Sequence, residues 1–489
     1  MKLNQSNLAD LPKNVAVPTY DRDAVTPGIL HIGVGNFHRA HQAVYANDLL
    51  NKGFSPEWGI CGAGVRQPDA KMRAALAEQN WLSSVVENDA NGMSASVAGA
   101  MVDFLPVEDG HRPIIDKIAA EKTRIVSLTV TEGGYFMDAA TGQFDPAHPD
   151  IHYDTKNLAA PRTVFGAIVA GLAARRGANG TPVTVMSCDN LPGNGDVARA
   201  AVLGLAQAAD KDLAAWIKDN VTFPNGMVDR ITPATTDRER SLLLENFGIE
   251  DVSPVFCEPF RQWVLEDKFA NGRPELDAVG VTLTPDVHDY EAMKIRVLNG
   301  GHAIIAYPGG LAGVEFVHDA MQVPEIEGFL RKSITDDILP NVKSIVGQDS
   351  VTYMNQTIER FKNPGVGDTI SRLCLDGSNR QPKFIVPSVR DVLASGRAPA
   401  GLALASALWC CYCGGVADDG SVIPPNDPNW ADLTAVAKNA ETDPLVWLEQ
   451  DHIYGDLRTS EQFCAAFAAA HASVRTNGAL GALRHYLAS

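Results

Sequence analysis

The segment EAMKIRVLNGGH carries four polar side chains at a spacing suited to chemistry on a hydroxyl group. On an α-helix that turns by about 100° per residue, these side chains fall within roughly 140° of one face. They are Glu291, Lys294, Asn299 and His302. Burial can lower the pKa of a lysine towards neutrality and make it a general base, and an asparagine amide can stabilise a developing alkoxide. The alternative is a solvated helix face with an i,i+3 Glu–Lys pair.

A glycine-containing turn near the N-terminus is the second candidate site. Residues 29–35, ILHIGVG, predict a buried strand and a tight turn, and the apolar spacing after them predicts a helix that ends at Gly53. A strand, a G-x-G turn and a helix N-terminus form the pyrophosphate cradle of dinucleotide-binding proteins. His38 stands where a third glycine is usual, so an ordinary strand–helix turn is the alternative. The candidate cofactor residues are Gly33, Val34, Gly35, Asn36 and Phe37.

Two charged residues could select between NAD and NADP. In dinucleotide folds, an acidic residue at the end of the second strand binds the adenosine ribose hydroxyls. The strand predicted over 58–65 is followed by Arg66 and Asp69, and Asp69 lies 34 residues past Gly35, where about 20 is usual. The connection between the two must therefore be longer than standard. Asp69 favours NAD because its carboxylate repels a 2′-phosphate, whereas Arg66 could pair with that phosphate.

A third candidate site follows the strand predicted over 181–188. The segment SCDNLPGNG places Asp189, Asn190 and Asn194 at the carboxyl end of that strand, which is where open α/β sheets bind ligands. An Asx-rich turn that caps the next helix is equally consistent with these residues.

Charged residues in two other segments are further candidates. MVDRITP places Asp229 and Arg230 beside a predicted strand. RLCLDGSNRQPKF holds Arg372, Arg380 and Lys383 in a predicted loop that could clamp an anion or polyol hydroxyls. An exposed basic loop is the alternative.

No metal site is expected. His31, His38 and His41 are close in sequence, but neither an H-E-x-x-H nor a Cys-x2-Cys pattern accompanies them. The eight cysteines are too sparse for a disulfide framework, and the CCYC cluster lies in the apolar run 400–417. That run predicts a buried core helix rather than a zinc site, a redox site or a membrane span.

The elements that must position these residues change character along the chain. Strand-like runs at 29–35, 58–65, 123–130 and 181–188 alternate with helical stretches such as 163–177. This alternation predicts an α/β fold with a doubly wound parallel sheet of the Rossmann type over residues 1–285. Helical periodicity dominates residues 286–489, which predicts a mostly α-helical second domain, with KFIVPS (383–388) as its clearest strand candidate.

Composition limits the possible partners. The net charge of −18 over 489 residues argues against nucleic acid and anionic membranes, since both would repel the protein. The start, MKLNQSNLADLPK, has no apolar segment typical of a secretion signal, so a cytoplasmic location is expected. The sequence does not distinguish a monomer from a small homo-oligomer.

The motifs together resemble a known family, the long-chain, zinc-independent polyol dehydrogenases. The matching segments occur in the same order in that family, from about residue 28 to the C-terminus, and the MVDRITP and KIRVLNGGH segments are specific to it. The others are HIGVGNFHRAHQ, TEGGY, SCDNLP, FPNGMVDRITP, CEPF and LDGSNRQPKF. The resemblance implies a Rossmann-type N-terminal domain, a helical C-terminal domain and an active site between them.

The resemblance also implies roles for the polar stripe. Lys294 matches the general base that takes the substrate hydroxyl proton. Asn299, with Asn190, matches the pair that polarises the carbonyl or stabilises the alkoxide. His302 matches a residue that orients the substrate, and Glu291 matches one linked to proton exchange with solvent.

The implied reaction is the NAD-dependent oxidation of mannitol to fructose and its reverse, with a polyol or ketose as the small-molecule partner. Asp69 matches the cofactor-selecting carboxylate, although Pro68 replaces an acidic neighbour and weakens the preference for NAD. Asp229 and Arg372 match positions near the cofactor and substrate. Arg380 stands where a lysine is expected, and beside Arg372 it could suit a carboxylate.

Two alternatives follow from these departures. Another polyol, such as arabinitol or sorbitol, or a sugar acid such as fructuronate could be the substrate. A dinucleotide-binding sensor without catalysis is the non-enzyme alternative, although Lys294, Asn190, Asn299 and His302 together favour an enzyme.

Overall fold

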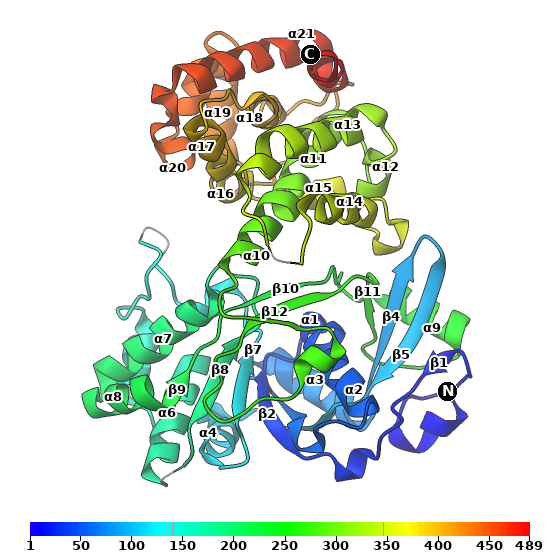
Figure 1. Cartoon of the computed structure of the whole chain (residues 1–489), viewed down its shortest axis with the longest axis vertical. Helices are drawn as coiled ribbons and strands as arrows, with labels where there is room; N and C mark the ends of the chain where they lie inside the picture. The colour runs from blue at the N-terminus through cyan, green and yellow to red at the C-terminus, as the bar shows by residue number, and fades with distance from the viewer. Residues whose placement is uncertain (139–140, 179, 346) are drawn as a thin grey trace. The chain divides into compact units, whose positions relative to one another are not determined.

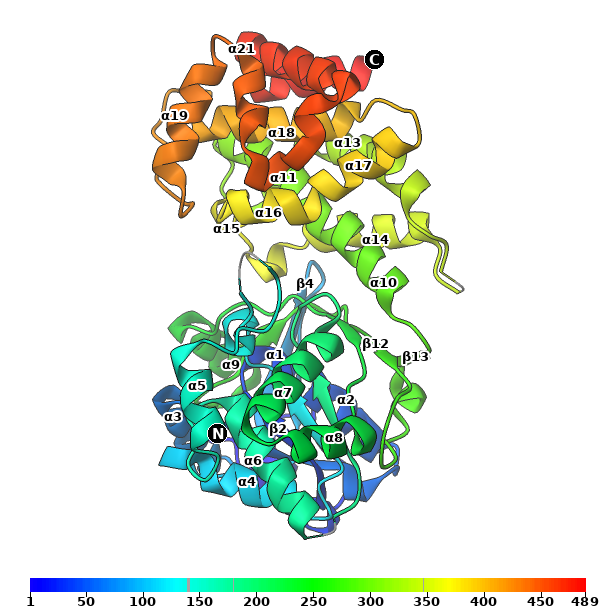
Figure 2. The same cartoon turned by 90° about the vertical axis from the view of Figure 1, so that its left-hand side faces the viewer.

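The computed structural model describes residues 1–138, 141–178, 180–345 and 347–489. The chain divides into an N-terminal unit, Met1–His288, and a C-terminal unit, Asp289–Ser489. Figures 1 and 2 show both units in two views.

The N-terminal unit is built on a six-stranded sheet in which every neighbouring pair is parallel. In sheet order, the strands are β6 (Met101–Phe104), β3 (Gly59–Ala63), β2 (Pro27–Ile32), β7 (Ile125–Leu128), β8 (Val183–Ser187) and β9 (Val221–Thr222). Numbered along the chain, this order is the 3-2-1-4-5-6 of a Rossmann fold. The predicted doubly wound parallel sheet is confirmed.

Both faces of this sheet are buried, as expected for parallel strands with crossover helices. Successive side chains of β2 point to opposite faces, so Leu30 and Ile32 pack into one core cluster and Ile29 into the other. Figure 1 shows helices gathered on the two sides. One face is covered by α4 (Arg112–Ala119), α6 (Val164–Gly177), α7 (Asn194–Ala209) and α8 (Lys211–Asn220). The other is covered by α2 (Gln42–Asn51) and α3 (Gln67–Ala77).

The helix predicted after β2 is broken in the structure. It consists of α1 (Asn36–Ala40) and α2, because His41 adopts φ −121° and ψ −86° between them. At the break, His41 Nε2 lies 2.9 Å from the carbonyl oxygen of Gln262. This is a tertiary contact that the periodicity of the segment does not encode.

Two smaller sheets, which the sequence analysis did not predict, complete the N-terminal unit. One has the order β1 (Val15–Ala16), β5 (Gly92–Ala98), β4 (Ser83–Asp89) and β11 (Val255–Cys257). The other has the order β10 (Gly226–Asp229), β12 (Gln262–Glu266) and β13 (Thr282–Thr284). The remaining helices of this unit are α5 (Pro149–Lys156) and α9 (Asp237–Phe247).

The C-terminal unit is helical, as predicted, and its helices surround α11. Figure 2 shows this bundle with the long α21 along α18. In chain order, the helices are α10 (His288–Met293), α11 (Gly300–Leu311), α12 (Val317–Ala320), α13 (Pro324–Ser333), α14 (Ser350–Phe361), α15 (Ile370–Leu373), α16 (Gly377–Phe384), α17 (Val386–Ala394), α18 (Ala400–Cys413), α19 (Trp430–Ala440), α20 (Asp451–Tyr454) and α21 (Glu461–Ala488). Two π-helical turns join neighbours, Lys294–Asn299 between α10 and α11, and Ile334–Ile338 after α13.

The strand predicted at 383–388 is wrong, because this segment is the end of α16 and the start of α17. The buried residues Ile385, Val389 and Val392 recur at helical spacing, and Pro387 occupies the first turn of α17, where a missing N–H has no cost. The short apolar run therefore belongs to a helix face rather than to a strand.

The apolar run that begins at residue 400 forms the buried helix α18, which confirms the predicted core helix. Cys410 and Cys413 are buried free thiols within it. Over the ranges given above, the chain has no helix that is both long and apolar enough to cross a membrane.

Candidate active site

The glycine turn lies at the carboxyl end of β2, beside the end of β7. Strand order reverses between these two strands, and the carboxyl ends at such a point are where α/β sheets bind ligands. Gly33 has φ +102°, and a Cβ there would lie 2.1 Å from the carbonyl oxygen of Thr129, so only glycine fits. A Cβ at Gly35 would meet no atom closer than 3.9 Å, which leaves its face open to a close ligand. Such a turn fits the pyrophosphate of a dinucleotide.

The other loop residues hold the turn in place. The Asn36 amide donates to the carbonyl of Pro233 and to Thr235 Oγ1, and its Oδ1 accepts from Arg39 at 2.8 Å. Val34 is buried in the core beneath the loop, and the ring of Phe37 stacks on His41 at 4.9 Å between centroids. The side chain of Asn36 thus stabilises the loop. The hydrogen-bond donors left for a phosphate are backbone N–H groups.

Arg66 and Asp69 lie together at the start of α3. Asp69 Oδ2 accepts from the backbone N–H groups of Val65 and Arg66, both at 2.9 Å, and so caps the helix. The Arg66 guanidinium is exposed and lies 3.6 Å from Asp69 Oδ1. The long spacing from Gly35 is accounted for by α1, α2 and a short 3-10 helix, Pro56–Trp58, before β3.

Two of the three polar residues after β8 have structural partners. Asp189 accepts from the N–H groups of Val130 and Thr131 and from the Tyr135 hydroxyl, and burial raises the pKa of its carboxyl. The side-chain amide of buried Asn194 donates to the carbonyls of Asp189 and Gly226, and its oxygen accepts from the N–H of Gly226. The expectation that these two are presented to a ligand is therefore wrong, whereas Asn190 is exposed.

The segment MVDRITP ends β10, and its first four residues, 227–230, are buried. Asp229 and Arg230 are each 4% exposed. The Arg230 guanidinium donates to the carbonyls of Glu258 and Ala40 and to the carboxylate of Glu87. Arg230 therefore ties β10 to α1 and β4.

In the C-terminal unit, Glu291 and Lys294 are 6% and 5% exposed, so the alternative of a solvated helix face is wrong for both. Residues Lys294–Asn299 form a π-helical turn instead of the regular α-helix assumed from the sequence. A π-helix bonds residue i to residue i+5, so residues five apart, such as Lys294 and Asn299, lie nearly above one another. The turn brings these two side chains closer in angle than an α-helix would, and π turns often occur at functional sites.

Asn299 and His302 each present a buried polar atom that lacks a protein partner. Asn299 Oδ1 and His302 Nε2 have no hydrogen-bond partner anywhere in the described chain. The His302 ring stacks on Phe361 at 4.2 Å, and burial lowers its pKa to about 3, so it is neutral at physiological pH. Other buried side chains of the described chain, such as Gln381, also carry polar atoms without a partner, so these two atoms are distinguished by their position beside Lys294 in sequence.

The predicted loop that holds Arg372 and Arg380 is instead helical, within α15 and α16. Arg372 forms a two-point ion pair with Asp368, which raises the pKa of its guanidinium, and Arg380 Nη1 donates to the carbonyl of Leu373 at 2.7 Å. The charge of Asp368 raises the pKa of His302, and the charges of Arg372 and Arg380 lower it. The Asp368–Arg372 ion pair therefore lies near that imidazole.

The three N-terminal histidines are buried among hydrogen-bonding and aromatic partners. Burial lowers the pKa of His31 and of His41 to about 3 and that of His38 well below its ordinary value, and the rings of His31 and His38 stack at 3.5 Å. Within the parts of the chain placed by the structure, no three His, Cys, Asp or Glu side chains are grouped to hold a metal ion.

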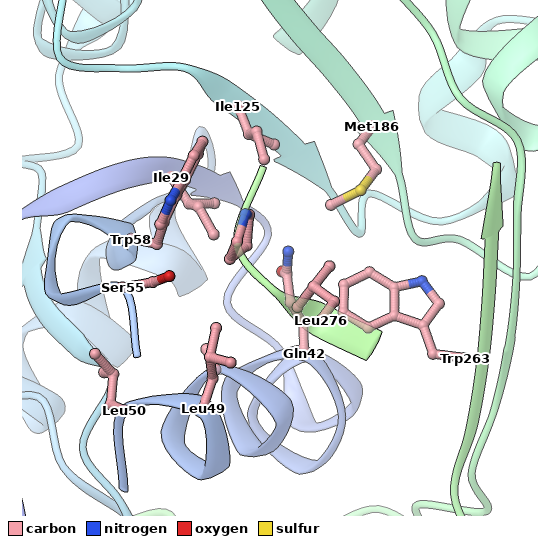
Figure 3. Close-up of a pocket in the computed structure, with 12 residues that line it drawn as sticks. Ile29, Gln42, Leu49, Leu50, Ser55, Trp58, Ile125, Met186, Trp263 and Leu276 are labelled. Carbon is pink, nitrogen blue, oxygen red and sulfur yellow. The ribbon is translucent and has the colours of Figure 1, made fainter. Parts of the chain in front are cut away.

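A mostly apolar pocket lies between α2 and the sheet (Figure 3), lined in part by Ile29, Trp58 and Ile125. These residues belong to the amino-end side of the sheet. The pocket also reaches Met186, near the carboxyl end of β8, and its lining is apolar rather than suited to a pyrophosphate.

A six-stranded parallel sheet with a glycine turn at its switch point, followed by a helical domain, defines a two-domain dehydrogenase architecture. Residues 27–278 match the model of the mannitol dehydrogenase Rossmann domain, and residues 286–475 match that of the mannitol dehydrogenase C-terminal domain. The chain belongs to the mannitol dehydrogenase family.

Individual relatives agree with this assignment. The chain is 56% identical to mannitol 2-dehydrogenase of Cereibacter sphaeroides, over 98% of this chain and 100% of the relative. Its structure resembles that of Pseudomonas fluorescens mannitol 2-dehydrogenase in a ternary complex with NAD and D-mannitol, with a TM-score of 0.87, 42% identity and full coverage of both chains. A D-sorbitol dehydrogenase in substrate-free form gives a TM-score of 0.92 at 36% identity, over 99% of this chain and 100% of the other.

Proposed function

We propose that this chain is an NAD-dependent polyol dehydrogenase that interconverts mannitol and fructose. The observation that carries the proposal is the buried π-helical turn, which holds Lys294 and Asn299 one turn apart and is followed by His302 with an unpaired Nε2. The identity to a mannitol 2-dehydrogenase over nearly the whole chain supports the substrate, and the solved complex with NAD and D-mannitol supports the cofactor.

Each candidate residue then has a separate role in proton transfer or substrate binding. Lys294 takes the proton from the substrate hydroxyl as general base. Asn299 and Asn190 donate amide N–H groups to the substrate oxygen. His302, held neutral, orients the substrate through Nε2, and Glu291 connects Lys294 to solvent for proton exchange. NAD, when bound, accepts the hydride released from the carbinol carbon.

Residues 1–285 are proposed as the dinucleotide-binding domain and residues 286–489 as the catalytic domain. The proposed cofactor residues are Gly33, Val34, Gly35, Asn36, Phe37, Arg66, Asp69 and Asp229. The open face at Gly35 supports the placement of the pyrophosphate. Asp69 excludes a 2′-phosphate by charge, and its capping bonds fix where that charge lies.

A neutral polyol is favoured over a sugar acid because Arg372 already has a carboxylate partner in Asp368. Arg372 and Arg380 are proposed to bind substrate hydroxyls with their remaining N–H groups. Sorbitol is the second candidate substrate, because the D-sorbitol dehydrogenase structure matches over nearly the whole chain.

The test of the proposal is the Lys294→Ala variant. We expect kcat for mannitol oxidation to fall by a factor of about 10² to 10⁴, while the Kd for NADH changes less than about twofold. The control is Lys438→Ala, an exposed lysine of α19, which should retain wild-type rates. Wild-type turnover in Lys294→Ala would overturn the assignment of the base. A screen of mannitol, sorbitol, arabinitol, fructuronate and tagaturonate identifies the substrate, and activity on none of them would favour the sensor.

A further inference from the structure

The carbonyl oxygen of Gly33, in the glycine turn, lies close to three polar groups. The backbone N–H of Gly35 lies 2.7 Å from it, the Thr129 hydroxyl 2.6 Å and His31 Nε2 3.2 Å. Thr129 directly follows β7 and His31 lies in β2, so two neighbouring strands hold this one carbonyl at the switch point of the sheet.

The direction of each hydrogen bond follows from the count of protons. The Thr129 hydroxyl has one proton and donates it to the Gly33 carbonyl, which cannot donate. Thr129 Oγ1 must therefore accept from His31 Nε2, which lies 2.9 Å away. A neutral imidazole that is protonated on Nε2 has a bare Nδ1, and the Ser127 hydroxyl lies 2.8 Å from that atom.

Ser127 also lies 3.2 Å from Gln42 Oε1, but its single proton can serve only one acceptor. Gln42 Oε1 has a second donor in His38 Nδ1 at 3.0 Å, whereas the described chain offers His31 Nδ1 no donor other than Ser127. The Ser127 proton is thus assigned to His31. The result is one directed chain of hydrogen bonds, in which Ser127 donates to His31, His31 donates to Thr129, and Thr129 donates to the carbonyl of Gly33.

The surroundings keep this chain in a single protonation state. Burial lowers the pKa of His31 to about 3, and its ring stacks on His38, whose pKa is also lowered by burial. His31 therefore stays neutral across the working pH range of a protein, with one donor and one acceptor nitrogen. The direction of the chain does not reverse with pH.

We propose that Thr129, oriented by His31 and Ser127, is a positioning residue for the cofactor's pyrophosphate, an inference that rests on the proposed NAD-dependent function. At φ +102°, Gly33 has the freedom to rotate its following peptide, and Thr129 holds that carbonyl towards the sheet. The N–H of Gly35 is used by this carbonyl, and the remaining N–H groups of the loop are then left to face an anion.

The test compares two substitutions of Thr129. Thr129→Val keeps the shape but has no hydroxyl, and we expect the Kd for NADH to rise by about tenfold or more. At saturating NADH and substrate, kcat should stay within about threefold, and the KM for fructose should be unchanged. Thr129→Ser restores the donor and should return the Kd to within about threefold of the wild type. Ser127→Ala, which removes only the first link, should raise the Kd by a smaller factor.

Thr222→Val is the matched control. Thr222 lies in the same sheet and is half-buried, as Thr129 is, and its hydroxyl lies 3.0 Å from that of Thr184. Its loss therefore reports the general effect of removing a half-buried hydroxyl. We expect wild-type NADH binding in this variant. An unchanged Kd in folded Thr129→Val would overturn the inference, and so would equal loss of binding in Thr129→Val and Thr129→Ser. If Thr129→Val fails to fold, an unchanged Kd in Ser127→Ala overturns it. Failure of the wild-type protein to bind NADH would instead overturn the proposed function.

Discussion

Asp368 neutralises the guanidinium of Arg372, which could otherwise attract negatively charged substrates. The Asp368 side chain is 10% exposed, and its carboxylate pairs at two points with Arg372, whose side chain is half exposed. Two-point pairs between arginine and carboxylate are strong and directional, so a second carboxylate would have to compete with Asp368 for the same N–H groups. Selection against acidic substrates can therefore come from a residue that touches no substrate.

Asp368→Asn is expected to shift the substrate preference. The amide keeps the size of the side chain but releases the charge of Arg372, so the ratio of kcat/KM for fructuronate to that for fructose should rise by about tenfold. Initial rates of NADH oxidation with each ketose measure this ratio. Asp336→Asn, which removes an exposed partner of Lys332, is the control and should leave the ratio unchanged. An unchanged ratio in Asp368→Asn would show that Arg372 does not select by charge.

At the level of residues, the sequence indicates which groups are reactive but not which of them are already paired. Lys294, Asn299 and His302 were singled out by type and spacing, and their roles remain proposals. The Asp368–Arg372 pair has an i,i+4 spacing that was available in the sequence and was missed. Thr129 has no local signal, because its partner, the carbonyl of Gly33, lies 96 residues away in the sequence, just after the neighbouring strand β2.

At the level of elements, long periodic segments were predicted well and local departures were not. The strands β2, β3, β7 and β8 and the helix α6 lie where alternation placed them. The six residues of KFIVPS are too short to distinguish a strand from a buried helix face by periodicity. The π-helical turn Lys294–Asn299 lies against α14 and α16, which come much later in the sequence, and no local pattern indicates it.

The last helix, α21, contains a break that a distant side chain stabilises. Gly478 has φ +68° inside it, and the N–H of Ala479 donates to Asp418 Oδ2 at 2.7 Å, so residues 479–488 begin as a separately capped helix. This second segment holds on to α13 through the Arg484–Glu325 ion pair. The cap thus determines how firmly the C-terminus is bound to the bundle.

We expect Asp418→Ala to destabilise this end of the bundle by about 1 kcal/mol, because one helix N–H loses its acceptor. Amide hydrogen exchange should become faster across residues 479–488 and stay unchanged in α11. The neighbouring Asp419 accepts from the N–H of Ser421 within a turn, so Asp419→Ala is the matched control. Equal exchange in the two variants would mean that Asp418 does not anchor the segment.

At the level of the whole molecule, the charge of −18 describes the surface and not the sites. A negatively charged cofactor is still expected to bind, because local N–H groups outweigh a distant net charge that salt screens over about 10 Å. In the interior, burial keeps several histidines neutral. Burial lowers the pKa of His31, His41 and His302 to about 3 and that of His38 well below 6.5.

These four imidazoles predict the sign of the response to acid. Below about pH 6.5 they are protonated in the unfolded chain and neutral in the folded one, so unfolding takes up protons. Their contribution to stability is complete above the unfolded pKa and is lost as the pH falls below it, by about 1.4 kcal/mol per pH unit for each imidazole that stays neutral in the folded protein. The folded carboxyls of Asp189 and Asp337, whose pKa values are raised by burial, act in the opposite direction.

Potentiometric titration of folded and denatured protein at pH 5.5 measures this difference. We expect a net uptake on unfolding of about four protons from these four imidazoles. His471, whose pKa burial also lowers, adds to this uptake, and any protons that Asp189 and Asp337 release reduce it. At pH 7.5 the same imidazoles are nearly neutral in both states, so their uptake should fall to a fraction of a proton. A net release at pH 5.5 would mean that the histidines under the glycine turn are charged in the folded state. It would also remove the fixed direction of the chain from Ser127 to Gly33.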